Sequence, residues 1–193
     1  MSISASQVKE LREMSGVGMM ECKKALVETD GDLEKALDLL RANSSLKAEK
    51  KASRVAADGE VKAASHADHT SLVEINSETD FAAKDEQFKD FTNSVAEYLA
   101  NNNAQSIEEL GEAFEEKRQS LIQSIGENIQ LRRLKNIEKP SGGTIGAYIH
   151  SDGRLAALVS IDSDNQDLAK DLAMHVSATN PSCLKSDDID PEL

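Results

Sequence analysis

The stretch Asn76-Ser77-Glu78-Thr79-Asp80-Phe81-Ala82-Ala83-Lys84-Asp85 stands between a strand pattern and a helix pattern, and the rest of the chain is organised around it. The segment before it, Leu72-Val73-Glu74-Ile75, is typical of a strand, and apolar residues recur at helical spacing after it. The side chain of Phe81, between Asp80 and Lys84, is either packed beneath its own loop or exposed so that another surface can bury it. The sequence leaves both alternatives open at this point.

An internal repeat surrounds this stretch. One set of residues recurs at an offset of 84: Gly59, Val61, Ala63 and His66 match Gly143, Ile145, Ala147 and His150. A second set recurs at an offset of 86: Leu72, Val73, Ile75 and Ser77 match Leu158, Val159, Ile161 and Ser163. Both copies predict a β-hairpin followed by a helix.

The two copies differ in length between the hairpin and the helix. Ser163 is five residues from the first apolar helix position, Leu168, whereas Ser77 is eleven residues from Phe88. The first copy therefore carries an insertion of about six residues that contains Thr79-Asp80-Phe81. Because the second copy has no such insertion, this stretch is a better candidate for function than for packing.

Composition limits the classes of function. The net charge of -13 lies in the second part of the chain, since residues 1–54 hold ten Lys and Arg against nine Asp and Glu, and residues 55–193 hold twelve against twenty-six. So acidic a body repels phosphate, and we expect no nucleic-acid partner. No apolar run approaches the roughly 18 residues of a membrane span, and the N-terminus lacks a signal-peptide pattern, so we expect no membrane partner and a cytoplasmic location. Cys22 and Cys183 form no Cys-x-x-Cys pair, which fits a reducing compartment.

Hydrophobic periodicity predicts an α+β fold: a helical bundle, then an antiparallel sheet covered by helices. Residues 1–42 are expected to form three short helices, the first capped by Ser4 or Ser6 and burying Val8, Leu11 and Met14. Residues 43–54 are expected to form an exposed, basic helical linker. Two adjacent methionines, Met19 and Met20, cannot both point into so small a core, because neighbouring helix positions lie about 100° apart.

The core is expected to hold two repeats, at residues 55–139 and 140–193. In the first, Ser106-Ile107-Glu108-Glu109 is a capping box that opens a long helix, Gly126 ends that helix, and a third strand begins at Ile129. The second repeat has no counterpart of this long helix and third strand, so it is incomplete by its own pattern. Either the chain is a fragment, or another chain, such as a second copy in a homodimer, completes the half-sheet.

Several segments resemble the elongation factor Ts family, in that family's order and over the whole chain. They are Thr79-Asp80-Phe81-Ala82-Ala83-Lys84-Asp85, Val8-Lys9-Glu10-Leu11-Arg12, Gly16 to Leu26, Ala56-Ala57-Asp58-Gly59, Ile125-Gly126-Glu127-Asn128-Ile129 and Ala173-Met174-His175-Val176. Position 82, commonly Val in the family, is Ala here, and full-length members continue well beyond Leu193. The resemblance implies a ubiquitin-associated-like fold for the N-terminal bundle.

The resemblance also implies a function and a set of contact residues. The family consists of guanine-nucleotide exchange factors that bind elongation factor Tu, in its GDP-bound and nucleotide-free forms, without covalent chemistry. By this resemblance, Asp80 and Phe81 insert next to the nucleotide and its magnesium ion. The residues expected to contact elongation factor Tu are Lys9, Arg12, Met19, Met20, Lys23, Thr79, Asp80, Phe81, Ala82 and His150.

Signals for other chemistry are weak. The chain has no Gly-x-x-x-x-Gly-Lys-Ser/Thr loop, so we expect no direct nucleotide binding, and we expect no catalytic residue, cofactor or metal. His66 and His69 supply two metal ligands without a third nearby in sequence. Lysines in residues 43–54 are not interleaved with aromatic residues as RNA sites require, and the tail Asp187-Asp188-Ile189-Asp190 lacks the spaced ligands of a calcium loop.

Two other classes of function stay open. One is a ubiquitin-associated-like binding module attached to an unrelated acidic core, which places all function in residues 1–54. The other is a metal-dependent hydrolase, whose activity a chelator would abolish. Neither class needs a Phe displayed at position 81, so the insertion favours nucleotide exchange.

Overall fold

The structure is a computed structural model that describes residues 3–189. Its described residues form two compact units: residues 3–59, 74–95 and 104–133 make the first, and residues 60–73, 96–103 and 134–189 make the second. No helix among residues 3–189 combines the length and apolar character needed to cross a bilayer.

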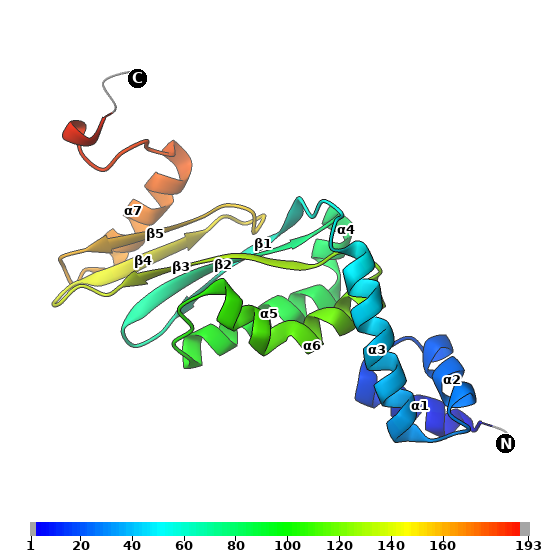
Figure 1. Cartoon of the computed structure of the whole chain (residues 1–193). Coiled ribbons are helices and arrows are strands. Elements are labelled where there is room, and N and C mark those ends of the chain that lie inside the picture. Colours follow the sequence, from blue (N-terminus) through cyan, green and yellow to red (C-terminus); the bar gives the residue numbers. More distant parts are fainter. Residues whose placement is uncertain (1–2, 190–193) are drawn as a thin grey trace. The chain divides into compact units, whose positions relative to one another are not determined.

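The chain alternates helices with two small sheets, which confirms the predicted α+β class (Figure 1). Strands β1 (Asp58–Ser65), β2 (His69–Ser77) and β3 (Gln130–Glu138) form one sheet in the order β1-β2-β3, and β4 (Thr144–Ile149) pairs antiparallel with β5 (Ala156–Ile161). The helices are α1 (Ala5–Ser15), α2 (Met19–Glu28), α3 (Leu33–Lys51), α4 (Asp80–Lys84), α5 (Glu86–Asn101), α6 (Ile107–Ile125) and α7 (Gln166–Thr179), with a short 3-10 turn at Ser186–Asp188. Of the acidic tail, Asp190 lies outside the described residues.

Helices α1, α2 and α3 form the expected bundle at the N-terminus, drawn blue to cyan in Figure 1. Ser4 and Gln7 form a capping box at the start of α1, and Gly16 ends the helix with φ of 68°. Aliphatic residues and one buried thiol fill the core between the helices: Val8, Leu11, Val17, Cys22, Ala25, Leu26, Ala36 and Leu40. Met14 was predicted to join them, but its side chain is exposed, because the core of so short a bundle is already filled by Leu11 and Val17.

Helix α3 does not stop where the bundle ends. It continues without a break to Lys51 and packs against α6. The predicted exposed character of residues 43–54 is therefore wrong at Ser44 and Ala48, which are buried beneath α6. Lys51 adds a polar link, since its ammonium donates to the carbonyl of Gly126 at the end of α6.

The first repeat has the predicted hairpin, helix, long helix and third strand. Helix α5 buries Phe88, Phe91, Val95 and Leu99, the residues with helical spacing in the sequence. Ser106 caps α6 by accepting from the amide of Glu109, and Gly126 ends it with φ of 86°. The insertion between β2 and α5 folds into the single short helix α4.

The second repeat consists of the β4–β5 hairpin and α7. In the hairpin, Thr144 pairs with Ile161 at one end and Ile149 pairs with Ala156 at the other. Gly146 lets α7 approach closely, because a Cβ atom there would lie 2.1 Å from the carbonyl of Ala169. The buried positions of α7 are Ala169 and Ala173, whereas Leu168 is exposed. Two small residues of α7 thus make its close contact with the strands.

Candidate partner-binding site

The insertion holds Phe81 out of the fold. Thr79 is the N-cap of α4, and its hydroxyl oxygen accepts from the amide of Ala82 at 3.3 Å. Ala82 is 4% exposed and fastens the helix to the protein, while the neighbouring Phe81 is 80% exposed. Of the two alternatives that the sequence left open, the structure has the second, because the Phe81 ring is not covered by its own loop.

Asp80 precedes Phe81 in the first turn of α4. Its carboxylate forms an ion pair with Lys84, one helical turn later, at 2.7 Å. The Lys84 side chain is largely exposed and the Asp80 side chain is about half exposed, so this pair contributes little to folding and leaves the Asp80 side chain partly accessible. The short helix therefore carries an exposed aromatic ring and a partly exposed carboxylate at consecutive positions.

The base of α4 is tied to the chain that follows α6. The Thr79 amide donates to Glu127 Oε2 at 3.0 Å, and the Thr79 hydroxyl donates to Glu127 Oε1 at 2.7 Å. In return, the Asn128 amide donates to Glu78 Oε1 at 2.7 Å. The sequence analysis did not assign Glu78, Glu127 or Asn128 to the site. The only signal was the family-like stretch Ile125–Ile129, which gave no hint of contact with Thr79.

The bundle displays the other predicted contact residues of the first unit. Met19 is 44% exposed and Met20 is 75% exposed, so both methionines, rather than one of them, lie at the surface. Neither methionine points into the core, because α2 buries Cys22, Ala25 and Leu26, a face that includes neither of them. Lys9, Arg12 and Lys23 are also exposed, and Lys9 forms only a loose ion pair with Glu13 at 3.7 Å.

His150 belongs to the second unit, at the turn between β4 and β5. Its Nδ1 atom lies 3.0 Å from Asp152 Oδ1, and both side chains are about half exposed. The backbone amide of Arg154, followed by the His150 side chain, lowers the pKa of the Asp152 carboxyl below its ordinary range. Asp152 therefore stays ionised at neutral pH and holds the imidazole at the turn.

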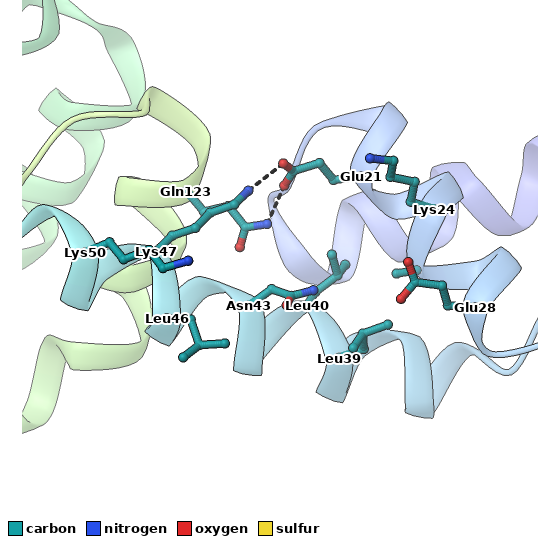
Figure 2. A pocket seen from close by; sticks show the side chains of 11 residues that line it. Glu21, Lys24, Glu28, Leu39, Leu40, Asn43, Leu46, Lys47, Lys50 and Gln123 are labelled. Atoms are coloured by element: carbon teal, nitrogen blue, oxygen red, sulfur yellow. Dashed lines mark hydrogen bonds and ion pairs between the residues drawn. The ribbon is translucent and has the colours of Figure 1, made fainter.

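A separate cavity of about 320 Å³ lies between α2, α3 and α6, where Figure 2 shows its lining. The carboxylate of Glu21 accepts from Lys47 at 2.5 Å and from the amide of Gln123. Partial burial acts to raise the pKa of Glu21, but the hydrogen bonds from Lys47 and Gln123 together outweigh it, and the pKa falls below its ordinary value. This polar link joins the bundle to α6 and includes none of the predicted contact residues.

The two histidines of the first hairpin turn, His66 and His69, have ring centroids 5.0 Å apart. Within residues 3–189, no three His, Cys, Asp or Glu side chains are arranged to hold a metal ion.

Taken together, these features define a class of protein: a three-helix bundle followed by a repeated hairpin–helix core, with an exposed Phe on an insertion in the first repeat. Comparison with known proteins agrees with this class. A family model described as "Elongation factor TS" matches residues 78–193. The chain belongs to the elongation factor Ts family, a family of translation elongation factors.

Individual relatives are similar over the entire chain. Elongation factor Ts of Hahella chejuensis is 49% identical over 195 residues, which cover 100% of this chain and 67% of that protein. Elongation factor Ts of Thioalkalivibrio sulfidiphilus is 45% identical over 201 residues, covering 100% and 68%, and that of Saccharophagus degradans is 49% identical over 196 residues, covering 100% and 67%. The chain thus spans about two thirds of the length of these relatives.

Proposed function

We propose that the chain binds elongation factor Tu and accelerates the release of GDP by inserting Phe81 and Asp80 next to the nucleotide and its magnesium ion. The observation that carries this proposal is the 80% exposure of Phe81 on a helix that the second repeat lacks. Membership of the elongation factor Ts family supplies the partner and the reaction.

The exposed ring provides the free energy for opening the partner. Full burial of a Phe side chain contributes about 1.5–3 kcal/mol, so covering the exposed four fifths of Phe81 contributes about 1.2–2.4 kcal/mol. Since about 1.4 kcal/mol changes a rate or an equilibrium tenfold, Phe81 alone accounts for roughly a tenfold to fiftyfold effect. The free protein keeps the ring in water, and this free energy is gained only in the complex.

Asp80 adds an electrostatic effect. A carboxylate placed near a bound nucleotide repels the phosphates and competes for the magnesium ion, which prefers oxygen ligands. The nucleotide-free form of elongation factor Tu then binds this chain best. Thermodynamic reciprocity requires that GDP weakens the binding of this chain by the same factor by which the chain weakens GDP binding.

The bundle supplies the remaining affinity. Met19 and Met20 offer flexible, polarizable side chains that adapt to a partner, and Lys9, Arg12 and Lys23 add exposed positive charges on α1 and α2. Thr79 and Ala82 shape the base of α4, and His150 adds a contact from the second unit. In this account the chain acts in the cytoplasm, binds no nucleotide itself and forms no covalent intermediate.

The alternative of a binding module on an unrelated core has lost its support. The family match begins at residue 78, beyond the bundle, and runs through the core itself. Relatives named elongation factor Ts are similar over the entire chain, the bundle included, and this similarity supports a function that the bundle and the core share.

Release of a fluorescent GDP analogue from elongation factor Tu tests the proposal. We expect release to accelerate with the concentration of this chain and then to saturate, and sedimentation under the same conditions reads whether the chain acts as monomer or homodimer. An unchanged release rate at concentrations that form a complex would refute the proposal.

A further inference from the structure

We propose that Glu127 is a positioning residue for nucleotide exchange: together with Glu78 it clamps the base of α4 and thereby fixes where Phe81 is presented. The inference rests on the proposed function of Phe81. The clamp consists of Glu78, Thr79, Glu127 and Asn128, all within the first compact unit.

The clamp is reciprocal. The Glu127 side chain binds the main chain of the segment that opens α4, through the Thr79 amide at 3.0 Å. The Glu78 side chain, from that same segment, binds the main chain next to Glu127, through the Asn128 amide at 2.7 Å. Each carboxylate accepts from the backbone amide of the residue that follows the other glutamate: Glu127 from Thr79, and Glu78 from Asn128. These two bonds, between residues 48 and 50 positions apart in sequence, fix the two segments in position and in direction.

Thr79 transmits this constraint to the helix that carries Phe81. Its hydroxyl has one proton, which it donates to Glu127 Oε1 at 2.7 Å, and the oxygen keeps its lone pairs for the Ala82 amide at 3.3 Å. A carboxylate at position 127 thus sets the orientation of the hydroxyl that caps α4. Since α4 has only five residues, its direction depends on this cap more than on its own hydrogen bonds.

The clamp also joins α4 to the bundle. The Asn128 side-chain amide donates to the carbonyl of Arg54 at 2.8 Å, just beyond the end of α3, and the Arg54 guanidinium lies 3.4 Å from Glu78. Asn128 is fully buried, so this joint is shielded from water. In the proposed complex the bundle binds the partner and α4 opens it, and the clamp holds the two at a fixed spacing.

Glu127→Gln tests the charge of the clamp with almost no change in shape. The amide has a single oxygen, which stays with the Thr79 amide, and its NH₂ group then faces the Thr79 hydroxyl, whose proton loses its acceptor. We expect the maximal rate of GDP release at saturating chain to fall about tenfold, with the half-saturating concentration changed by less than about twofold, because one charge-assisted hydrogen bond is lost and the bundle is untouched. Glu112→Gln, on the exposed face of α6, is the matched control and should match the wild type.

A double-mutant cycle separates positioning from a merely structural role. If Glu127 acts through Phe81, then Glu127→Gln should cause no further loss of rate in a Phe81→Ala background. Full additivity of the two losses, or a wild-type rate for Glu127→Gln, would overturn the inference.

One further measurement does not depend on the activity of the variant. Hydrogen exchange at the Ala82 and Ala83 amides should become at least several-fold faster in Glu127→Gln, while exchange in the core of α6 stays unchanged. If Glu127→Gln proves poorly folded, Thr79→Val removes only the hydroxyl and should show the same loss of rate, whereas Thr79→Ser should restore it. A wild-type chain that fails to accelerate release would refute the proposed function alone, and unchanged exchange at Ala82 and Ala83 would refute the clamp alone.

Discussion

Phe81 and Phe88 lie seven residues apart and differ completely in exposure. Substituting each by Ala therefore distinguishes the effect of an exposed side chain from that of a side chain packed in the core. Phe81 is 80% exposed, whereas Phe88 is 0% exposed. Because only about one fifth of the Phe81 side chain is buried in the free protein, only about one fifth of the burial free energy of a Phe stabilises the fold at this position. Phe81→Ala should therefore lower the free energy of unfolding by only about 0.3–0.6 kcal/mol. Phe88→Ala empties a filled site in the core and should cost about 3–5 kcal/mol.

Urea unfolding followed by far-UV circular dichroism measures both variants on one scale. The midpoint of Phe81→Ala should lie close to that of the wild type with an unchanged slope, and the midpoint of Phe88→Ala should fall strongly. A loss above about 2 kcal/mol for Phe81→Ala would show that the ring packs against the fold and is not held out, since exposed sites rarely cost so much.

Three further predictions concern other parts of the molecule. Substituting both Met19 and Met20 by Ala should raise the half-saturating concentration in the GDP-release assay more than it lowers the maximal rate, because both side chains are exposed on the bundle; a lower maximal rate with unchanged half-saturation would contradict this. Glu21 has a pKa below its ordinary value near 4.5, so the stability that its carboxylate contributes is present above that value and lost as the pH falls through the lower folded-state pKa. The difference in unfolding free energy between the wild type and Glu21→Gln should accordingly shrink on acidification below about pH 4.5, and urea titrations in which it persists would exclude this role. Gly146→Ala should sharply lower the melting temperature, since its Cβ would lie 2.1 Å from the carbonyl of Ala169; a wild-type melting curve would show that α7 can shift without cost.

Local chemistry made much of the fold predictable. The N-cap at Ser4 or Ser6, the cap at Ser106 and the helix end at Gly126 all depend on residues within a few positions of one another, and the structure confirms them, with Ser4 as the first cap. The hairpin–helix repeat was visible because its apolar residues recur at a nearly constant offset. Patterns of this kind need no knowledge of what packs against them.

The predictions that proved wrong involve contacts between distant segments. Ser44 and Ala48 look like linker residues, and they are buried only because α6, some 75 residues later, covers α3. Met14 has the right spacing for the core, but its position is not needed to fill a bundle of this size.

The candidate site likewise combines features that the sequence predicts with a contact between distant segments that it does not. The insertion and its Phe81 were predictable from the unequal repeats, because they change the spacing of the sequence. The bond from Thr79 to Glu127 spans 48 residues, and a Glu after a helix-ending Gly looks like any solvated carboxylate. Tertiary structure alone brings these two residues together.

The most direct test of the account compares the wild type with Phe81→Ala in the release of fluorescent GDP from elongation factor Tu, at saturating concentrations of each chain. We expect the wild type to accelerate release and Phe81→Ala to lower the maximal rate by roughly tenfold to fiftyfold while it still binds and folds. If Phe81→Ala accelerates GDP release from elongation factor Tu as strongly as the wild type, then the exposed ring does not open the nucleotide site and the proposed function of Phe81 is refuted.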